Sequence, residues 1–128
     1  MCIRDSTETD SGYTEAQYNF NVATYLKQDL EGEGAQVVMT RTTNSGVGPC
    51  VTTRAAIIND AHADVAVDIH ADGGPPGGRG FAVLEPVADG PNDDVITASE
   101  QFATIMRDDF LRTGMPVSSC LLYTSRCV

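Results

Sequence analysis

The sequence lacks long hydrophobic runs, internal repeats and an ample supply of basic residues. No apolar stretch among the 128 residues approaches the roughly 20 that a membrane-spanning helix needs, so we expect no membrane span. Only 8 Lys and Arg residues oppose 18 Asp and Glu residues, and a net charge of -10 repels phosphate backbones, so we expect no nucleic-acid partner. The 41% hydrophobic and 20% charged residues are instead typical of one small globular domain.

Cysteine is also scarce once the two ends are set apart. Cys2, Cys120 and Cys127 lie close to the termini, and only Cys50 is internal. The opening MCIRDS and the later CLLYTS can be encoded by one short DNA word, read forwards at the start and as its reverse complement at the end. This word resembles a transposase adapter used for sequencing libraries. We therefore expect residues 1–6 and 120–128 to be adapter-derived, and residues 7–119 to be a partial domain of a longer gene.

Hydrophobic spacing and turn residues predict three helices and three strands. Thr14 and Gln17 form a capping-box pattern ahead of the first helix, which Gly32 and Gly34 end. The helices are expected at residues 15–30, 51–63 and 94–112, and the strands at residues 36–40, 65–69 and 81–84. The strand at 65–69 is nearly all apolar, as in a strand buried on both faces. This order predicts an α/β fold with a central, mostly parallel sheet covered by helices on both faces, truncated at both ends.

Two side chains are expected to meet at one edge of this sheet. His70 directly follows the strand at 65–69, and Glu15 lies in the first turn of its helix. Ligands of open α/β sheets collect where strands end and the following helices begin. Carboxylate oxygens and imidazole nitrogens bind Zn²⁺, although a catalytic zinc needs about three protein ligands. The local pattern leaves simpler interpretations open, because a first-turn glutamate also suits the helix dipole and a strand-end histidine is often only hydrogen-bonded.

Four segments carry a resemblance to a known family. They are GYTEAQYNFNVATYLKQDL, VVMTRTTN, VGPCVTTRAAIIN and ADVAVDIHADGGPPGGRGF, in that order. Together they resemble the zinc-dependent N-acetylmuramoyl-L-alanine amidases, and the last segment is similar to the actinobacterial form. The resemblance implies hydrolysis of the amide between the muramic acid lactyl group and L-alanine by zinc-activated water. It also implies peptidoglycan as the partner, an extracytoplasmic location, and a monomer in the full-length enzyme.

The resemblance assigns two metal ligands and no catalytic residue to this chain. Glu15 matches the glutamate ligand of the family and His70 its second histidine ligand. The first histidine, in a Gly-His motif, and the catalytic glutamate of the family match nothing in this sequence. The chain by itself is therefore expected to be inactive and to bind zinc weakly at best.

Five further residues are candidates for supporting roles. Arg41 and Arg54 match family arginines, for which we favour bracing of loops over contact with substrate, and Arg79 is the reachable charge of a rim loop. Asp68 stands where the family often has serine, and alternation places it on the same face as His70, where it could orient the imidazole. Cys50 resembles a cysteine that pairs with an upstream one. Since no equivalent partner is found, we expect half of a broken disulfide or a small buried apolar residue.

Two alternative functions remain. The glycine-rich residues 73–80 could cradle a phosphate, but Pro75 and Pro76 remove two backbone donors and no GK[ST] motif follows. A rim loop beside the metal site is the better interpretation. The other alternative is a non-catalytic peptidoglycan-binding domain, which the sequence of this chain does not distinguish from the enzyme.

Overall fold

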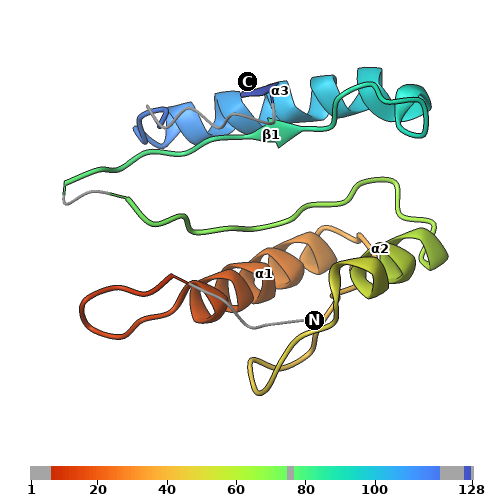
Figure 1. Ribbon diagram of the computed structural model, residues 1–128. Coiled ribbons are helices and arrows are strands. Elements are labelled where there is room, and N and C mark those ends of the chain that lie inside the picture. Colours follow the sequence, from red (N-terminus) through yellow and green to blue (C-terminus); the bar gives the residue numbers. More distant parts are fainter. Residues whose placement is uncertain (1–6, 75–76, 119–125, 128) are drawn as a thin grey trace. The chain divides into compact units, whose positions relative to one another are not determined.

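The computed structural model describes residues 7–74, 77–118 and 126–127, and it divides the chain into two units, Met1–Gly73 and Gly74–Val128 (Figure 1). The first unit contains helices α1 (Glu15–Gly32) and α2 (Val51–Asp60). The second contains strand β1 (Leu84–Glu85), the short 3₁₀ helix η1 (Asp93–Val95), helix α3 (Ile96–Arg112) and strand β2 (Arg126–Cys127). None of the helices in the described ranges is long and apolar enough to cross a membrane.

The first helix begins and ends where the local sequence predicts. The Thr14 hydroxyl accepts a hydrogen bond from the Gln17 backbone N–H at 3.2 Å, which satisfies one of the free donors of the first turn. After the helix, Gly34 adopts a φ of +93°, and the Ala35 N–H donates to the Leu30 carbonyl at 3.0 Å. A left-handed residue at this position favours glycine. The helix predicted at 15–30 is therefore confirmed, with two more residues at its end.

The second helix is shorter than predicted. It was expected to reach residue 63 but ends at Asp60, because His62 adopts a φ of +48°. The His62 N–H donates to the Asn59 carbonyl at 3.0 Å and closes a turn in place of another helical turn. His62 therefore follows the helix and does not belong to its last turn.

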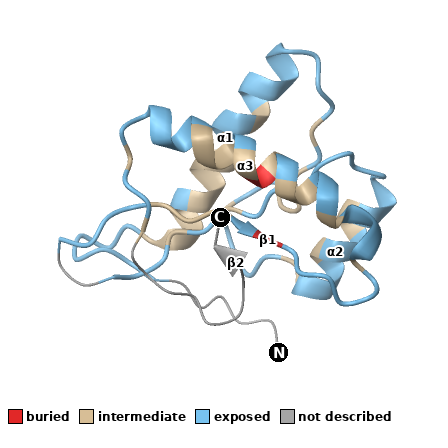
Figure 2. Ribbon diagram, turned by 90° about the horizontal axis from the view of Figure 1, so that it is seen from above, coloured by how far each residue is buried: buried red, intermediate tan, exposed pale blue. Residues whose placement is uncertain are grey.

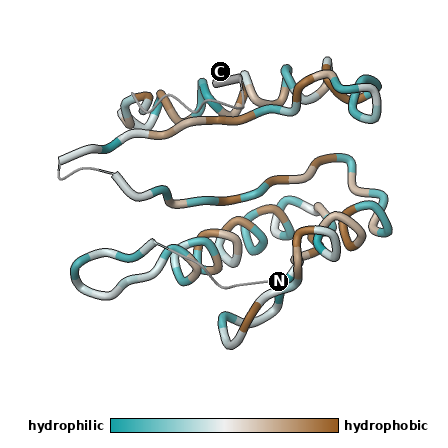
Figure 3. Tube along the Cα trace, viewed as in Figure 1, coloured by the Kyte–Doolittle hydropathy of each residue, from teal (hydrophilic) through white to brown (hydrophobic). Residues whose placement is uncertain are grey.

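The two segments of the first unit that were predicted as strands form no strand among the residues that the structure describes. The structure assigns no strand to residues 36–40 or 65–69, and residues 65–69 form an extended, partly hydrophobic segment (Figure 3). Val38, Val65 and Val67 leave 60%, 52% and 46% of their surface exposed. The expectation that 65–69 is buried on both faces is wrong for the described residues, because a buried strand needs neighbours on both edges. A central parallel sheet remains a prediction.

In the second unit, α3 packs beside β1, and β1 pairs in antiparallel register with β2. The strand predicted at 81–84 is displaced to Leu84–Glu85, and Phe81 forms only an isolated parallel bridge with Val117. The helix predicted at 94–112 is confirmed as α3, with η1 as its lead-in. The Phe81 ring stacks on Phe110 with centroids 5.0 Å apart.

Few residues are fully buried within the described ranges. Ala103 on α3 is 3% exposed and Glu85 on β1 is 9% exposed, and both lie in the second unit (Figure 2). In the first unit the N-terminal half of α1 is the best covered part, since residues 14–17 and 19–24 are all of intermediate exposure. The candidate site lies at the beginning of this helix.

Candidate metal site

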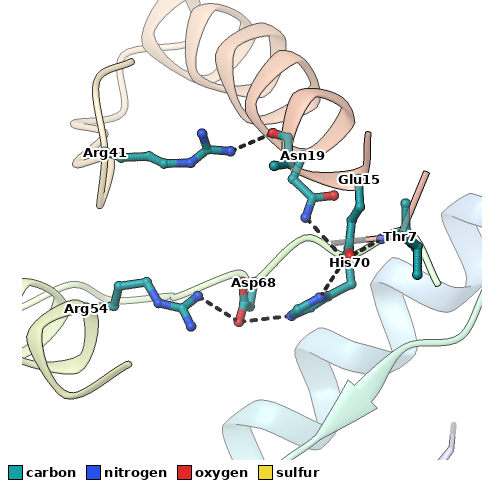
Figure 4. Close-up of polar contacts among 9 residues, drawn as sticks. Thr7, Glu15, Asn19, Arg41, Arg54, Asp68 and His70 are labelled. Atoms are coloured by element: carbon teal, nitrogen blue, oxygen red, sulfur yellow. Dashed lines mark hydrogen bonds and ion pairs between the residues drawn. The ribbon is translucent and has the colours of Figure 1, made fainter. Parts of the chain in front are cut away.

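Glu15 anchors the site from the first turn of α1. Its Oε1 atom lies 2.9 Å from Nδ1 of His70, and it accepts hydrogen bonds from the Ala71 backbone N–H at 3.1 Å and from Asn19 Nδ2 at 3.5 Å (Figure 4). The Glu15 side chain is only 14% exposed. The carboxylate is therefore held in one place by donors from its own helix and from the distant segment that carries His70.

His70 lies between two carboxylates. Its Nδ1 faces Glu15, and its Nε2 lies 3.4 Å from Oδ2 of Asp68, which belongs to the same extended segment. The next residue is held as well, because the Thr7 hydroxyl donates to the Ala71 carbonyl at 2.9 Å. Glu15 and His70 are thus in contact, as predicted, although the segment before His70 forms no strand among the described residues.

The contacts shift the pKa values of both groups toward an ion pair. Burial raises the pKa of Glu15, but hydrogen bonds from the Ala71 N–H, His70 and Asn19 outweigh it and leave the pKa below its ordinary value. Burial lowers the pKa of His70, but the hydrogen bond to Glu15 and the negative charge of Asp68 raise it above its ordinary value. Both shifts favour the charged forms, a negative Glu15 and a positive His70.

The donor set fits half of a zinc site. A carboxylate oxygen and an imidazole nitrogen that converge to 2.9 Å are the donor types that zinc takes. Asp68 contacts the opposite nitrogen of the ring, so it is not placed to share a metal ion with Nδ1. Among the residues that the structure describes, no group of three or more His, Cys, Asp or Glu side chains is arranged to hold a metal ion.

The three arginines differ in their surroundings. The Arg41 guanidinium donates to the Ala16 carbonyl at 2.6 Å and to the Thr43 carbonyl at 3.3 Å, and it lies over the Phe20 ring at 5.0 Å. It thus links the start of α1 to the loop after residue 41. Arg54, from α2, lies 3.6 Å from Oδ2 of Asp68. Arg79 belongs to the second unit, where its guanidinium contacts the Met115 sulfur at 3.8 Å.

Sequence reasoning missed two side chains that support Glu15 and its partner segment. Asn19 lies one turn after Glu15 on the same helix, and this i, i+4 spacing is a signal that could have identified it. Thr7 had no such signal, because its contact with Ala71 joins residues 64 positions apart. Contacts of this kind depend on the folded chain alone.

The structure bears on two other expectations. Cys50, the N-cap residue of α2, is disulfide-bonded, so the expectation of a cysteine without a partner is wrong. The glycine-rich loop leads into the Phe81 bridge and β1, and the following helix begins only at Asp93. A phosphate cradle needs a helix N-terminus directly after the loop, so this arrangement does not favour one. Pro75 and Pro76 of the loop lie outside the described residues.

Comparison with known proteins extends the resemblance to nearly the whole chain. Residues 4–121 match the N-acetylmuramoyl-L-alanine amidase family. The chain is 36% identical over 121 residues to N-acetylmuramoyl-L-alanine amidase Rv3717 of Mycobacterium tuberculosis (strain ATCC 25618 / H37Rv). The alignment covers 90% of this chain and 47% of that protein, so the chain spans about half the length of this relative. The match includes both Glu15 and His70, and the chain belongs to the N-acetylmuramoyl-L-alanine amidase family.

Proposed function

We propose that this chain is part of a zinc-dependent peptidoglycan amidase, which hydrolyses the amide between the muramic acid lactyl group and L-alanine. Family membership supports the reaction class, and the meeting of Glu15 Oε1 with His70 Nδ1 at 2.9 Å supports the metal. Peptidoglycan is the partner, and because it lies outside the cytoplasm, an extracytoplasmic location follows. We expect the full-length enzyme to act as a monomer built on a central, mostly parallel sheet.

In this proposal Glu15 and His70 hold the metal, and neighbouring residues hold these two side chains in place. Asn19 and the Ala71 N–H orient the Glu15 carboxylate, and Thr7 fixes the backbone beside His70. Arg41 braces the beginning of α1, which carries the ligand. When bound, zinc would polarise the amide carbonyl and activate a water molecule. No described residue is assigned the transfer of a proton to the leaving amine.

The test is zinc binding to the whole chain. We expect isothermal titration of the metal-free protein with Zn²⁺ to show weak binding with one site, because two protein ligands are fewer than the three of a catalytic zinc. The substitutions Glu15→Gln and His70→Gln should each abolish it. His62→Gln removes the other histidine and should leave zinc binding unchanged. Binding that survives both ligand substitutions would reject this metal pair.

Activity provides a second and independent test. The family that the chain resembles has a further histidine ligand and a catalytic glutamate, and neither is matched by a residue of this sequence. We therefore expect no release of stem peptides when the chain is incubated with peptidoglycan and zinc. Hydrolysis that a chelator stops would show that the chain has its own complete site. Co-sedimentation with insoluble peptidoglycan in the same assay would distinguish a domain that binds peptidoglycan from a chain that neither binds nor hydrolyses it.

Reading the gene beyond both ends would test the assignment of residues 7–119 to a partial domain. We expect an apolar strand ending in Gly-His upstream and a strand ending in glutamate downstream. A gene that begins at Met1 and stops after Val128 would contradict this, and it would favour the non-catalytic binding function.

A further inference from the structure

Asp68 lies between His70 and Arg54. Its Oδ2 atom lies 3.4 Å from His70 Nε2 and 3.6 Å from the Arg54 guanidinium (Figure 4). The three side chains come from two elements, with Arg54 on α2 and the other two on the extended segment. Because alternate residues of an extended chain share a face, Asp68 and His70 point the same way. Glu15 and Asp68 thus contact the two ring nitrogens of His70, and Arg54 contacts Asp68.

The two ring nitrogens have separate partners. Nδ1 faces Glu15 at 2.9 Å and Nε2 faces Asp68 at 3.4 Å. In metal sites, the hydrogen bond made by one ring nitrogen sets which of the two binds the metal and how the ring is turned. A carboxylate at Nε2 leaves Nδ1 as the nitrogen that can share a metal ion with Glu15.

We propose that Asp68 is a positioning residue that binds His70 through Nε2 and so presents Nδ1 to the metal position beside Glu15, while Arg54 holds Asp68 in place. This inference rests on the proposed function, in which Glu15 and His70 are zinc ligands. It adds a residue that touches neither metal nor substrate. Its effect on the metal passes through the ring of His70.

A purely structural role does not account for Asp68. The side chains of Asp68 and His70 are 66% and 61% exposed, and ion pairs this exposed contribute little to stability. Burial therefore gives no reason for a carboxylate at this position. Orientation of the neighbouring ring is the effect that such an exposed contact can have.

The decisive measurement is ¹⁵N NMR of the histidine ring in the full chain. The chain has two histidines, so the background His62→Gln leaves His70 as the single labelled ring. Without metal, Asp68→Ser should mainly shift the Nε2 resonance, whereas Glu15→Gln should mainly shift that of Nδ1. With Zn²⁺, the ligand resonance of the parent should be Nδ1. If Asp68→Ser leaves Nε2 unmoved, or if zinc binds the parent through Nε2, the inference is overturned.

Zinc affinity gives the functional readout. We expect Asp68→Ser to weaken Zn²⁺ binding about 10- to 100-fold, the usual effect of removing such a partner, and Asp68→Asn, which keeps an acceptor oxygen, to weaken it less. The matched control is Asp72→Asn, which removes one negative charge at an exposed position two residues beyond His70. It should leave the affinity within about twofold of the parent.

The outcomes separate this inference from the proposed function. If the parent binds zinc, Glu15→Gln abolishes binding and Asp68→Ser has no more effect than Asp72→Asn, the inference is wrong and the metal pair stands. If the parent binds no zinc, or if Glu15→Gln binds as well as the parent, both fail together. Arg54→Gln should reproduce part of the loss seen with Asp68→Ser, and an unchanged affinity would remove Arg54 from the arrangement.

Discussion

Glu15 and His70 lie 55 positions apart in the chain and meet with Oε1 2.9 Å from Nδ1. The same oxygen also accepts the Ala71 N–H, so one carboxylate atom joins the first turn of α1 to two consecutive residues of the extended segment. This contact fixes where the segment passes the helix. It therefore serves the architecture of the metal-free chain as well as the proposed metal site.

The stability of the metal-free chain should depend on pH through this pair. The lowered pKa of Glu15 stabilises the fold above its ordinary value of 4.5, and this is lost as the pH falls through the lowered pKa. The raised pKa of His70 stabilises the fold below its ordinary value of 6.5, and this is lost as the pH rises through the raised pKa. The joint contribution should therefore be largest between these two values. Urea unfolding of the parent and Glu15→Gln in chelator should differ most in that window, and a difference independent of pH would contradict the pairing.

Removal of the helix cap should destabilise the chain and loosen the site. Thr14→Ala deletes the hydroxyl that accepts the Gln17 N–H, and such a loss costs about 1 kcal/mol. Thr14→Ser keeps an acceptor and is the matched control. Urea unfolding monitored by circular dichroism should show the lower free energy of unfolding in the alanine variant only. Equal stability of the two variants would mean that this hydrogen bond does not contribute.

Arg41 should be difficult to replace because its guanidinium contacts two carbonyls and an aromatic ring together. Arg41→Ala should lower the free energy of unfolding by about 1–3 kcal/mol, since hydrogen bonds from a charged donor and a cation–π contact are lost. Arg41→Lys should recover only part, because lysine lacks the planar fork. Arg79→Ala, which removes a contact with one sulfur, is the control and should change stability by less than about 0.5 kcal/mol. Full recovery by lysine would show that the charge alone matters.

Gly80 should tolerate no side chain. Its φ is +147°, and an added Cβ would lie 2.8 Å from the Ser118 backbone and 2.9 Å from the Pro116 carbonyl oxygen. Gly80→Ala should therefore destabilise the second unit by about 1–3 kcal/mol and speed hydrogen exchange at the amides of the Phe81 bridge. Gly74→Ala meets nothing within 4 Å and is the control. Unchanged exchange at the Phe81 and Ser118 amides would contradict the close approach.

Local sequence was a good guide to the helices. α1 follows from its capping threonine, its apolar spacing and the glycine after it, and α3 follows from a regular apolar stripe. Each of these signals acts over four or five residues, which is the range over which a helix forms its hydrogen bonds. The end of α2 was misplaced because the left-handed backbone at His62 has no strong signal in the sequence.

The strands were less predictable because their hydrogen bonds join distant residues. β1 pairs with β2, more than 40 positions away, and the apolar segment 65–69 has the composition of a strand but no pairing among the described residues. Composition indicates which segments could pair, whereas the presence of a neighbour decides whether they do.

Capping, periodicity and motif order are properties of the linear chain, and they were enough to predict α1, α3, the family and the two candidate ligands. The folded chain was needed to show that Glu15 approaches Nδ1 of His70, that Asp68 lies beside Nε2 and that Arg54 from α2 contacts Asp68. Which nitrogen of a ring meets which carboxylate depends on how segments far apart in sequence pass one another. That choice is made by packing and long-range hydrogen bonds, which no local pattern encodes.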